Sequence, residues 1–209
     1  MITLIQNGGV VMWLILAGGL LALVVFLERL LYVHRAKIKA EDFIKGICNI
    51  LGRRNITEAL SICEETPGPV ARIVRAAIQY RDQERRLIEQ ALDATALTEI
   101  ARMERRLGVL AMVAQLAPLL GLFGTVLGMI RTFLALAQNA PLIQPGNLAG
   151  GVGQALLTTA AGLAVAMLAY AGYNLLVIKV DAIVLDMERS AGEIVGFFAA
   201  APQNSKAIG

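Results

Sequence analysis

The sequence has very few of the side chains that usually build metal and catalytic sites. Its 209 residues include one histidine, His34, and two cysteines, Cys48 and Cys63. A histidine-based site would have almost nothing to draw on, so we expect no metal ligands, no catalytic residues, no cofactor and no enzyme activity. Both cysteines lie in a charged segment that we place in the cytoplasm, where thiols stay reduced, so we expect no disulfide.

Charged residues are scarce as well. Only 17% of the residues are charged and 57% are hydrophobic, which is too apolar for an ordinary soluble domain. The formal net charge of +3 comes from segments that separate long apolar runs. This arrangement indicates membrane topology and no nucleic-acid partner. We therefore expect an all-α integral membrane protein with the lipid bilayer as its surroundings.

Three apolar runs predict three transmembrane helices. The first has no charged side chain before Glu28 and Arg29, and basic residues follow it, whereas a secretory signal has them in front. By the positive-inside rule the basic segment is cytoplasmic, so the N-terminus is periplasmic and the C-terminus cytoplasmic. The predicted segments are the N-terminus with helix 1 (1–33), a cytoplasmic helical region (34–107), helix 2 (108–137), a periplasmic loop (138–150), helix 3 (151–178) and a cytoplasmic C-terminal helix and tail (179–209).

The cytoplasmic region contains clear helix signals. Asn55, with Glu58 three residues later, forms an N-cap pattern, and the Pro-Gly-Pro of residues 67–69 ends the short helix that follows. Pro69 suits the first turn of the next helix. No glycine or proline follows before Gly108, so we expect one continuous helix from about residue 70 to about residue 136 that runs into the membrane. Two helices broken near Gly108 are the alternative.

Helices 2 and 3 each carry a ridge of small and hydroxyl-bearing residues, which we call the small ridges. At 100° per residue, large apolar side chains such as Leu120 and Phe123 fall on the opposite side of helix 2. Small residues let membrane helices approach closely, and a ridge that faces a pore would place its hydroxyls inside that pore. The ridge residues include Gly121, Thr125 and Gly128 in helix 2 and Ala155, Thr159, Gly162 and Ala166 in helix 3.

Strongly polar side chains in the central parts of helices 2 and 3 are limited to Thr125, Gln154, Thr158 and Thr159. No Asp, Glu, Lys, Arg or His lies there, and Arg131 is at the outer end of helix 2, where it can snorkel. A proton path normally needs a group that gains and loses protons. Either a partner supplies that group or the chain is not a proton path. A membrane threonine can also bond its own helix backbone, so a packing role is open too.

Two motifs resemble those of the MotA/TolQ/ExbB proton channel family. They are GLFGTVLGMIRTF at residues 121–133 and GVGQALLTTAAGLAVAMLAYAGYN at residues 151–174, and Glu28 with Arg29 at the end of helix 1 fits the same family. The resemblance covers essentially the whole chain. It is closest to the ExbB and TolQ branch, because the flagellar stator branch has four spans.

The resemblance implies a homopentamer in the bacterial inner membrane around two transmembrane helices of an ExbD- or TolR-like partner. Such a partner has a single span that carries one aspartate. Proton-motive force would move the pentamer relative to the partner, and a TonB- or TolA-like protein would receive the work in the periplasm. By motif position, Thr125 and Thr159 resemble the pore threonines that hydrogen-bond the aspartate or its waters.

One position departs from the family pattern. The family commonly has a glutamate in a GIxEALxxTAxG arrangement, where this chain has Gln154 in GVGQALLTTAAG. Glutamine does not titrate, so the resemblance does not carry a proton-binding role to this position, although the amide still donates and accepts hydrogen bonds. Gln154 also lies about 100° around the helix from the small ridge that carries Thr159, which favours a contact with a neighbouring subunit.

The predicted function is therefore a proton channel and motor subunit of energy transduction, with Thr125, Thr158, Thr159 and Gln154 along the proton pathway. The alternative is a membrane scaffold, or a stator-type subunit of another MotA/TolQ/ExbB system without its own proton relay. A membrane-embedded enzyme is a third interpretation, for which the sequence offers no nucleophile–base set and no metal cluster.

Overall fold

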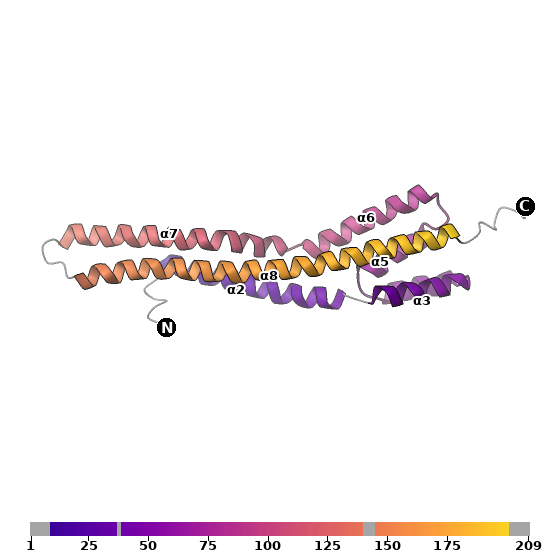
Figure 1. Ribbon diagram of the computed structural model, residues 1–209, viewed down its shortest axis with the longest axis horizontal. Coiled ribbons are helices and arrows are strands. Elements are labelled where there is room, and N and C mark those ends of the chain that lie inside the picture. Colours follow the sequence, from indigo (N-terminus) through magenta and orange to yellow (C-terminus); the bar gives the residue numbers. More distant parts are fainter. Residues whose placement is uncertain (1–8, 37–38, 140–144, 201–209) are drawn as a thin grey trace, which may run out of the picture. The chain divides into compact units, whose positions relative to one another are not determined.

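The computed structural model describes residues 9–36, 39–139 and 145–200, and every regular element in these residues is an α-helix (Figure 1). The helices in chain order are α2 (Gly9–Ala36), α3 (Ala40–Gly52), α4 (Ile56–Glu65), α5 (Pro69–Gln79), α6 (Arg85–Glu104), α7 (Leu107–Asn139) and α8 (Pro145–Ala200).

Three of these helices are long and apolar enough to cross a membrane. The candidate spans begin at Val10 in α2, cover Leu107–Ala137 in α7 and cover Gly150–Ala199 in α8. Their outward faces carry large apolar side chains, such as Leu20, Phe133 and Leu168, each more than half exposed. Such faces are stable only against lipid or other apolar surfaces. The three expected spans are thus confirmed as membrane-length apolar helices.

The chain divides into two units. Unit 1 consists of the described part of Met1–Arg29 together with Arg106–Leu176, and unit 2 of Leu30–Arg105 together with the described part of Val177–Gly209. Within unit 1, α7 and the first part of α8 run side by side (Figure 1). The candidate site lies along the line where these two helices meet.

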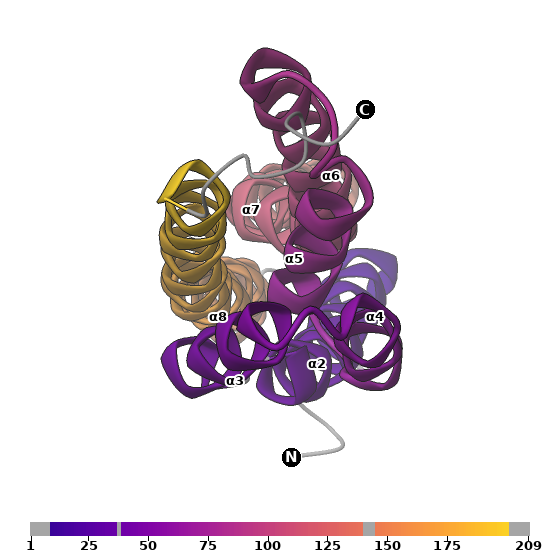
Figure 2. The same cartoon turned by 90° about the vertical axis from the view of Figure 1, so that its right-hand side faces the viewer.

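Unit 2 is built around α5. Residues on nearly every side of this short helix are buried, including Val70, Ile73, Val74 and Ile78. Helices α4 and α6 both pack on α5, and α3 packs on α4 (Figure 2). The later part of α8 contributes its own apolar stripe, with Ile183, Met187 and Ile194 all buried. This is the amphipathic C-terminal helix that the sequence predicts.

Local signals fixed the ends of α4 and α5 correctly. The Asn55 side chain accepts a hydrogen bond from the Glu58 amide (3.4 Å) and donates one to the Glu58 carboxylate (2.6 Å). Pro69 occupies the first turn of α5, after Gly68 with a φ of 127°, which favours glycine.

A buried carboxylate joins α5 to α6. Glu99 on α6 has a side chain only 6% exposed, and Arg72 on α5 donates to it at 2.6 Å. Arg102 lies 3.4 Å from the other carboxylate oxygen. The Glu99 carboxylate raises the pKa of Arg72, chiefly through their hydrogen bond. Two guanidinium groups therefore offset the cost of burying one negative charge.

The expected continuous helix from residue 70 to residue 136 is wrong. It is divided at residues 80–84 and again at residues 105–106. At the first division the Arg81 guanidinium donates to the Ile78 carbonyl (3.2 Å), which satisfies a carbonyl group at the end of α5. At the second, Arg106 adopts a left-handed φ of 79°. These helices therefore end without glycine or proline, and the alternative of a break near Gly108 is closer to the structure.

Candidate functional site

The small ridges of α7 and α8 pack against each other along a line that we call the seam. A Cβ at Gly162 would lie 2.5 Å from the Ala117 carbonyl oxygen, and one at Gly128 would lie 2.8 Å from the Cβ of Ala155. A Cβ at Gly121 would lie 3.1 Å from the Thr159 Cα. The two backbones therefore approach as closely as they do because glycine and alanine leave room. Ala155 and Gly162 are buried at this seam, and Ala166, one turn after Gly162, is buried as well.

Thr159 links the two helices across the seam. Its hydroxyl donates a hydrogen bond to the Gly121 carbonyl oxygen at 3.0 Å, a contact between residues 38 positions apart in sequence. A carbonyl inside an α-helix already accepts one amide, and its second lone pair accepts the hydroxyl. Thr159 as a whole is half-buried.

The neighbouring Thr158 is turned toward α2. It is 2% exposed, and its hydroxyl donates to the Ala155 carbonyl at 2.7 Å. A Cβ at Gly124 would come within 2.6 Å of this hydroxyl and 3.3 Å of Val11 on α2. Gly124 and Thr158 therefore mark the side of the seam that α2 covers.

Thr125 follows Gly124, as Thr159 follows Thr158, so both are rotated by about 100° from the positions that face α2. The Thr125 hydroxyl donates to the Leu122 carbonyl in its own helix at 2.6 Å, and the residue is half-buried. Thr125 and Thr159 each use their single proton and keep an acceptor oxygen. That Thr125 and Thr159 line a pore stays a prediction, because such a pore would form between several subunits and the structure contains one chain.

Gln154 lines a small polar hollow inside its own chain. The cavity has a volume of about 70 Å³ and lies between α2, α7 and α8. Its polar lining includes Gln154, Arg131, Thr132 and Thr158. At about 30 Å³ per water, the hollow has room for two waters with several polar partners. This placement gives Gln154 intrachain neighbours, where the sequence favoured a neighbouring subunit.

An ion pair stands where α2 and α7 leave the apolar region. The Arg106 guanidinium donates to the Glu28 carboxylate, and both side chains are about half exposed. Arg29 beside it is only 6% exposed. The sequence singled out Glu28 and Arg29 but missed Arg106, which follows Glu104 and Arg105 in an unbroken charged run. That run, directly before an apolar segment, was the available signal for a helix end.

The described residues contain no group of three or more His, Cys, Asp or Glu side chains placed to hold a metal ion. The sequence itself has no acidic residue from Leu107 through Lys179. What the seam offers chemically is hydrogen bonding by neutral hydroxyl, amide and carbonyl groups.

A family model and several known proteins match this chain, and their descriptions agree. Residues 65–189 match the model of the MotA/TolQ/ExbB proton channel family. The chain is 32% identical over 177 residues to a biopolymer transport protein ExbB homolog of Methanothermobacter thermautotrophicus, covering 84% of this chain and 62% of that protein. It is 29% identical to the biopolymer transport protein exbB1 of Vibrio cholerae, with 88% and 82% coverage. It is 40% identical over 99 residues to the Tol-Pal system protein TolQ of Haemophilus influenzae, with 46% and 42% coverage.

Proposed function

Because the chain belongs to the MotA/TolQ/ExbB proton channel family, in its ExbB/TolQ branch, we propose that it forms the channel of an inner-membrane energy-transducing complex. Five copies surround the spans of an ExbD- or TolR-like partner that brings one aspartate. Proton-motive force then drives work on a periplasm-spanning, TonB- or TolA-like protein. The N-terminus is periplasmic and the C-terminus cytoplasmic.

The observation that carries the proposal is the hydrogen-bond state of Thr125 and Thr159. Each hydroxyl donates to a backbone carbonyl and retains acceptor capacity, and both residues are half-buried. A protonated aspartic acid, or a water, can donate to such an oxygen. An ionised aspartate needs donors, which these hydroxyls provide only by giving up a carbonyl bond. Neutral threonines of this kind therefore favour the protonated form of the partner's aspartic acid when its carboxyl group lies next to them.

The same bonds favour a second candidate, a scaffold whose threonines only hold helices together. The hydroxyl groups of Thr125, Thr158 and Thr159 all donate hydrogen bonds to backbone carbonyl groups, and the Thr159 bond joins α7 to α8. A substitution of Thr125 distinguishes the channel from the scaffold, because the Thr125 hydroxyl bonds a carbonyl group of its own helix and does not join two helices.

The test is proton flux into vesicles that contain the chain with a single-span, aspartate-bearing partner. We expect Thr125→Val and Thr159→Val to abolish flux while native mass spectrometry still finds the intact assembly. Thr159→Ser, which keeps the hydroxyl, should restore flux. Thr98→Val is the matched control, since the Thr98 hydroxyl makes a similar bond to the Ala94 carbonyl in α6 (2.9 Å).

Wild-type flux in Thr125→Val would overturn the pore role of that residue. Loss of the assembly in Thr159→Val together with normal flux in Thr125→Val would establish the scaffold instead. Gln154→Ala should be milder than either valine variant, because Gln154 lines the hollow on the side of α2.

A further inference from the structure

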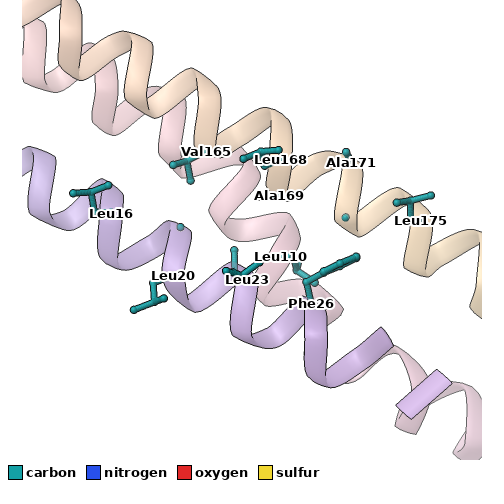
Figure 3. Close-up of a pocket in the computed structure, with 13 residues that line it drawn as sticks. Leu16, Leu20, Leu23, Phe26, Leu110, Val165, Leu168, Ala169, Ala171 and Leu175 are labelled. Carbon is teal, nitrogen blue, oxygen red and sulfur yellow. The ribbon is translucent and has the colours of Figure 1, made fainter. Parts of the chain in front are cut away.

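Two cavities of unit 1 differ in their chemistry. The larger has a volume of about 570 Å³, lies between α2 and α8, and is lined only by apolar residues such as Leu23, Phe26 and Val165 (Figure 3). Apolar walls of this kind do not distinguish one hydrocarbon chain of the bilayer from another. The smaller cavity is the polar hollow of about 70 Å³, with Arg131 and Gln154 in its lining. Of the two, the hollow offers groups that can select a ligand.

Arg131 and Gln154 bring unused hydrogen-bond donors to the hollow. Within the described residues, neither the Arg131 guanidinium nor the Gln154 amide makes a hydrogen bond or an ion pair. A guanidinium has five N–H donors and no acceptor, and an amide nitrogen has two donors. The hydroxyls of Thr132 and Thr158 are already engaged, since each donates to a backbone carbonyl of its own helix, at 2.8 and 2.7 Å. The unused donors therefore belong to a cation and an amide.

Arg131 has no acidic side chain to pair with in unit 1. Glu28 is the one acidic residue in segments 1–29 and 106–176, and its carboxylate pairs with Arg106. Arg131 follows Leu107, the first residue of α7, by 24 residues, which at about 1.5 Å per residue is about 36 Å. That length exceeds the thickness of the hydrocarbon core, so Arg131 lies at the other end of the span from the Glu28–Arg106 pair.

A small anion satisfies the unused donors of the hollow. Halides and carboxylate groups accept hydrogen bonds from guanidinium and amide N–H groups, and bonds that involve a charged partner are the strong ones. Because the hollow has room for about two waters, one small anion and one water fill it. Arg131 is itself exposed, so an anion can reach the guanidinium from the water at the membrane surface. Water alone would leave the charge of Arg131 without a counter-ion.

We propose that the polar hollow binds one small monovalent anion, a halide or a carboxylate of the size of formate, through the Arg131 guanidinium and the Gln154 amide. The anion neutralises the positive charge at this end of the span. The anion site does not include Thr125 or Thr159, and its test does not involve proton flux. It therefore stands or fails separately from the proposed function.

The test is chloride-35 NMR of the purified chain in an uncharged detergent, because exchange with a protein site broadens the signal of chloride in solution. Arg131→Gln removes the charge from the hollow. Gln154→Glu places a carboxylate in the lining of the hollow, where it can pair with Arg131 and exclude a free anion. Arg86→Gln is the matched control, since Arg86 on α6 is also exposed and has no ion pair within the described residues.

We expect the native chain and Arg86→Gln to broaden the chloride signal with the same saturable dependence on concentration. Arg131→Gln should weaken chloride binding by at least about tenfold, as for the loss of hydrogen bonds from a charged donor. Gln154→Glu should abolish the saturable broadening. Competition then distinguishes the two kinds of anion. Formate displaces chloride at a lower concentration than bromide does if a carboxylate is preferred, and at a higher one if a halide is preferred.

Saturable broadening that is unchanged in Arg131→Gln would place the bound chloride elsewhere and overturn the proposal. The absence of saturable broadening in the native chain would also overturn it, because the hollow would then hold water alone while the Arg131 side chain extends to the membrane surface. Thermal unfolding checks that each variant is folded. If Arg131→Gln does not fold, unchanged broadening in Gln154→Glu overturns the proposal in its place.

Discussion

At the scale of single residues, the two cysteines differ in their surroundings. Cys63 on α4 is 3% exposed, and burial raises the pKa of its thiol to about 11, with Arg75 opposing the rise and Glu64 adding to it. Cys48 on α3 is half-buried, and burial also raises the pKa of its thiol. Burial therefore leaves both thiols less acidic than an ordinary cysteine, and the two differ in accessibility.

This difference predicts unequal labelling. With a pKa of about 11 in place of 9.0, the Cys63 thiol has about 100-fold less thiolate at neutral pH than an ordinary thiol. We expect a maleimide to label Cys48 first at neutral pH. Cys63 should react only as the pH rises toward its pKa, or on unfolding. Mass spectrometry after timed labelling measures both rates. Equal rates at neutral pH in the folded protein would contradict the burial of Cys63.

The same residue scale shows what the sequence could predict of the site. Helical spacing placed Gly121, Gly128 and Thr159 on small ridges, and these ridges do meet. Spacing cannot say what a ridge faces, however. A ridge toward a lumen and a ridge toward another helix have the same pattern, because both need small side chains. The hydrogen bond from Thr159 to Gly121 therefore became visible only with the structure.

At the scale of elements, the seam between α7 and α8 depends on missing side chains. Gly162 has a carbonyl oxygen of the other helix where a Cβ would be, and a backbone carbonyl cannot move aside as a flexible side chain can. A Cβ at Gly153, on the same helix, would have no atom of another segment within 4 Å. The two glycines therefore form a matched pair with opposite surroundings.

We expect Gly162→Ala to force α7 and α8 apart and to lower stability by about 1–3 kcal/mol, the usual cost of overpacking. Gly153→Ala should be neutral or slightly stabilising, because alanine favours a helix. Thermal unfolding of the detergent-solubilised protein compares them with the native chain. If the two variants melted at the same temperature, the close approach at Gly162 would be wrong.

Helix boundaries show where sequence rules succeed and fail. Asn55 and Pro69 act through local backbone geometry, so the ends of α4 and α5 could be predicted. The break at Arg106 involves Glu28, which lies 78 residues earlier. Sequence rules for helix ends consider only neighbouring residues and cannot include a partner so far away. The long helix was therefore expected to continue.

At the scale of the whole molecule, charge divides the chain between membrane and water. Unit 1 holds the apolar spans, and unit 2 holds most of the charged residues together with both cysteines. Composition alone was sufficient for this division, because a charged residue in the bilayer is costly. The distribution of basic residues also gives the predicted orientation, with the basic segment in the cytoplasm.

The orientation can be checked with an impermeant maleimide. Ala137 lies exposed near the end of α7, on the side predicted to be periplasmic. We expect Ala137→Cys, in a chain with Cys48 and Cys63 replaced by alanine, to be labelled in intact cells with a permeable outer membrane. Cys48, in a chain with Cys63→Ala, should be labelled only after the inner membrane is opened. The reverse pattern would invert the topology.

The glycines of the seam also bear on how this sequence can evolve. Every single-nucleotide change of a glycine codon that alters the amino acid introduces at least a Cβ. At Gly121, Gly128 and Gly162 that atom meets the opposite helix. These positions therefore have no neighbouring codon that preserves the contact, whereas Thr159 can pass to serine and keep its hydroxyl. In a population of variants, α7 and α8 should change together at the seam, through paired substitutions on the two facing helices.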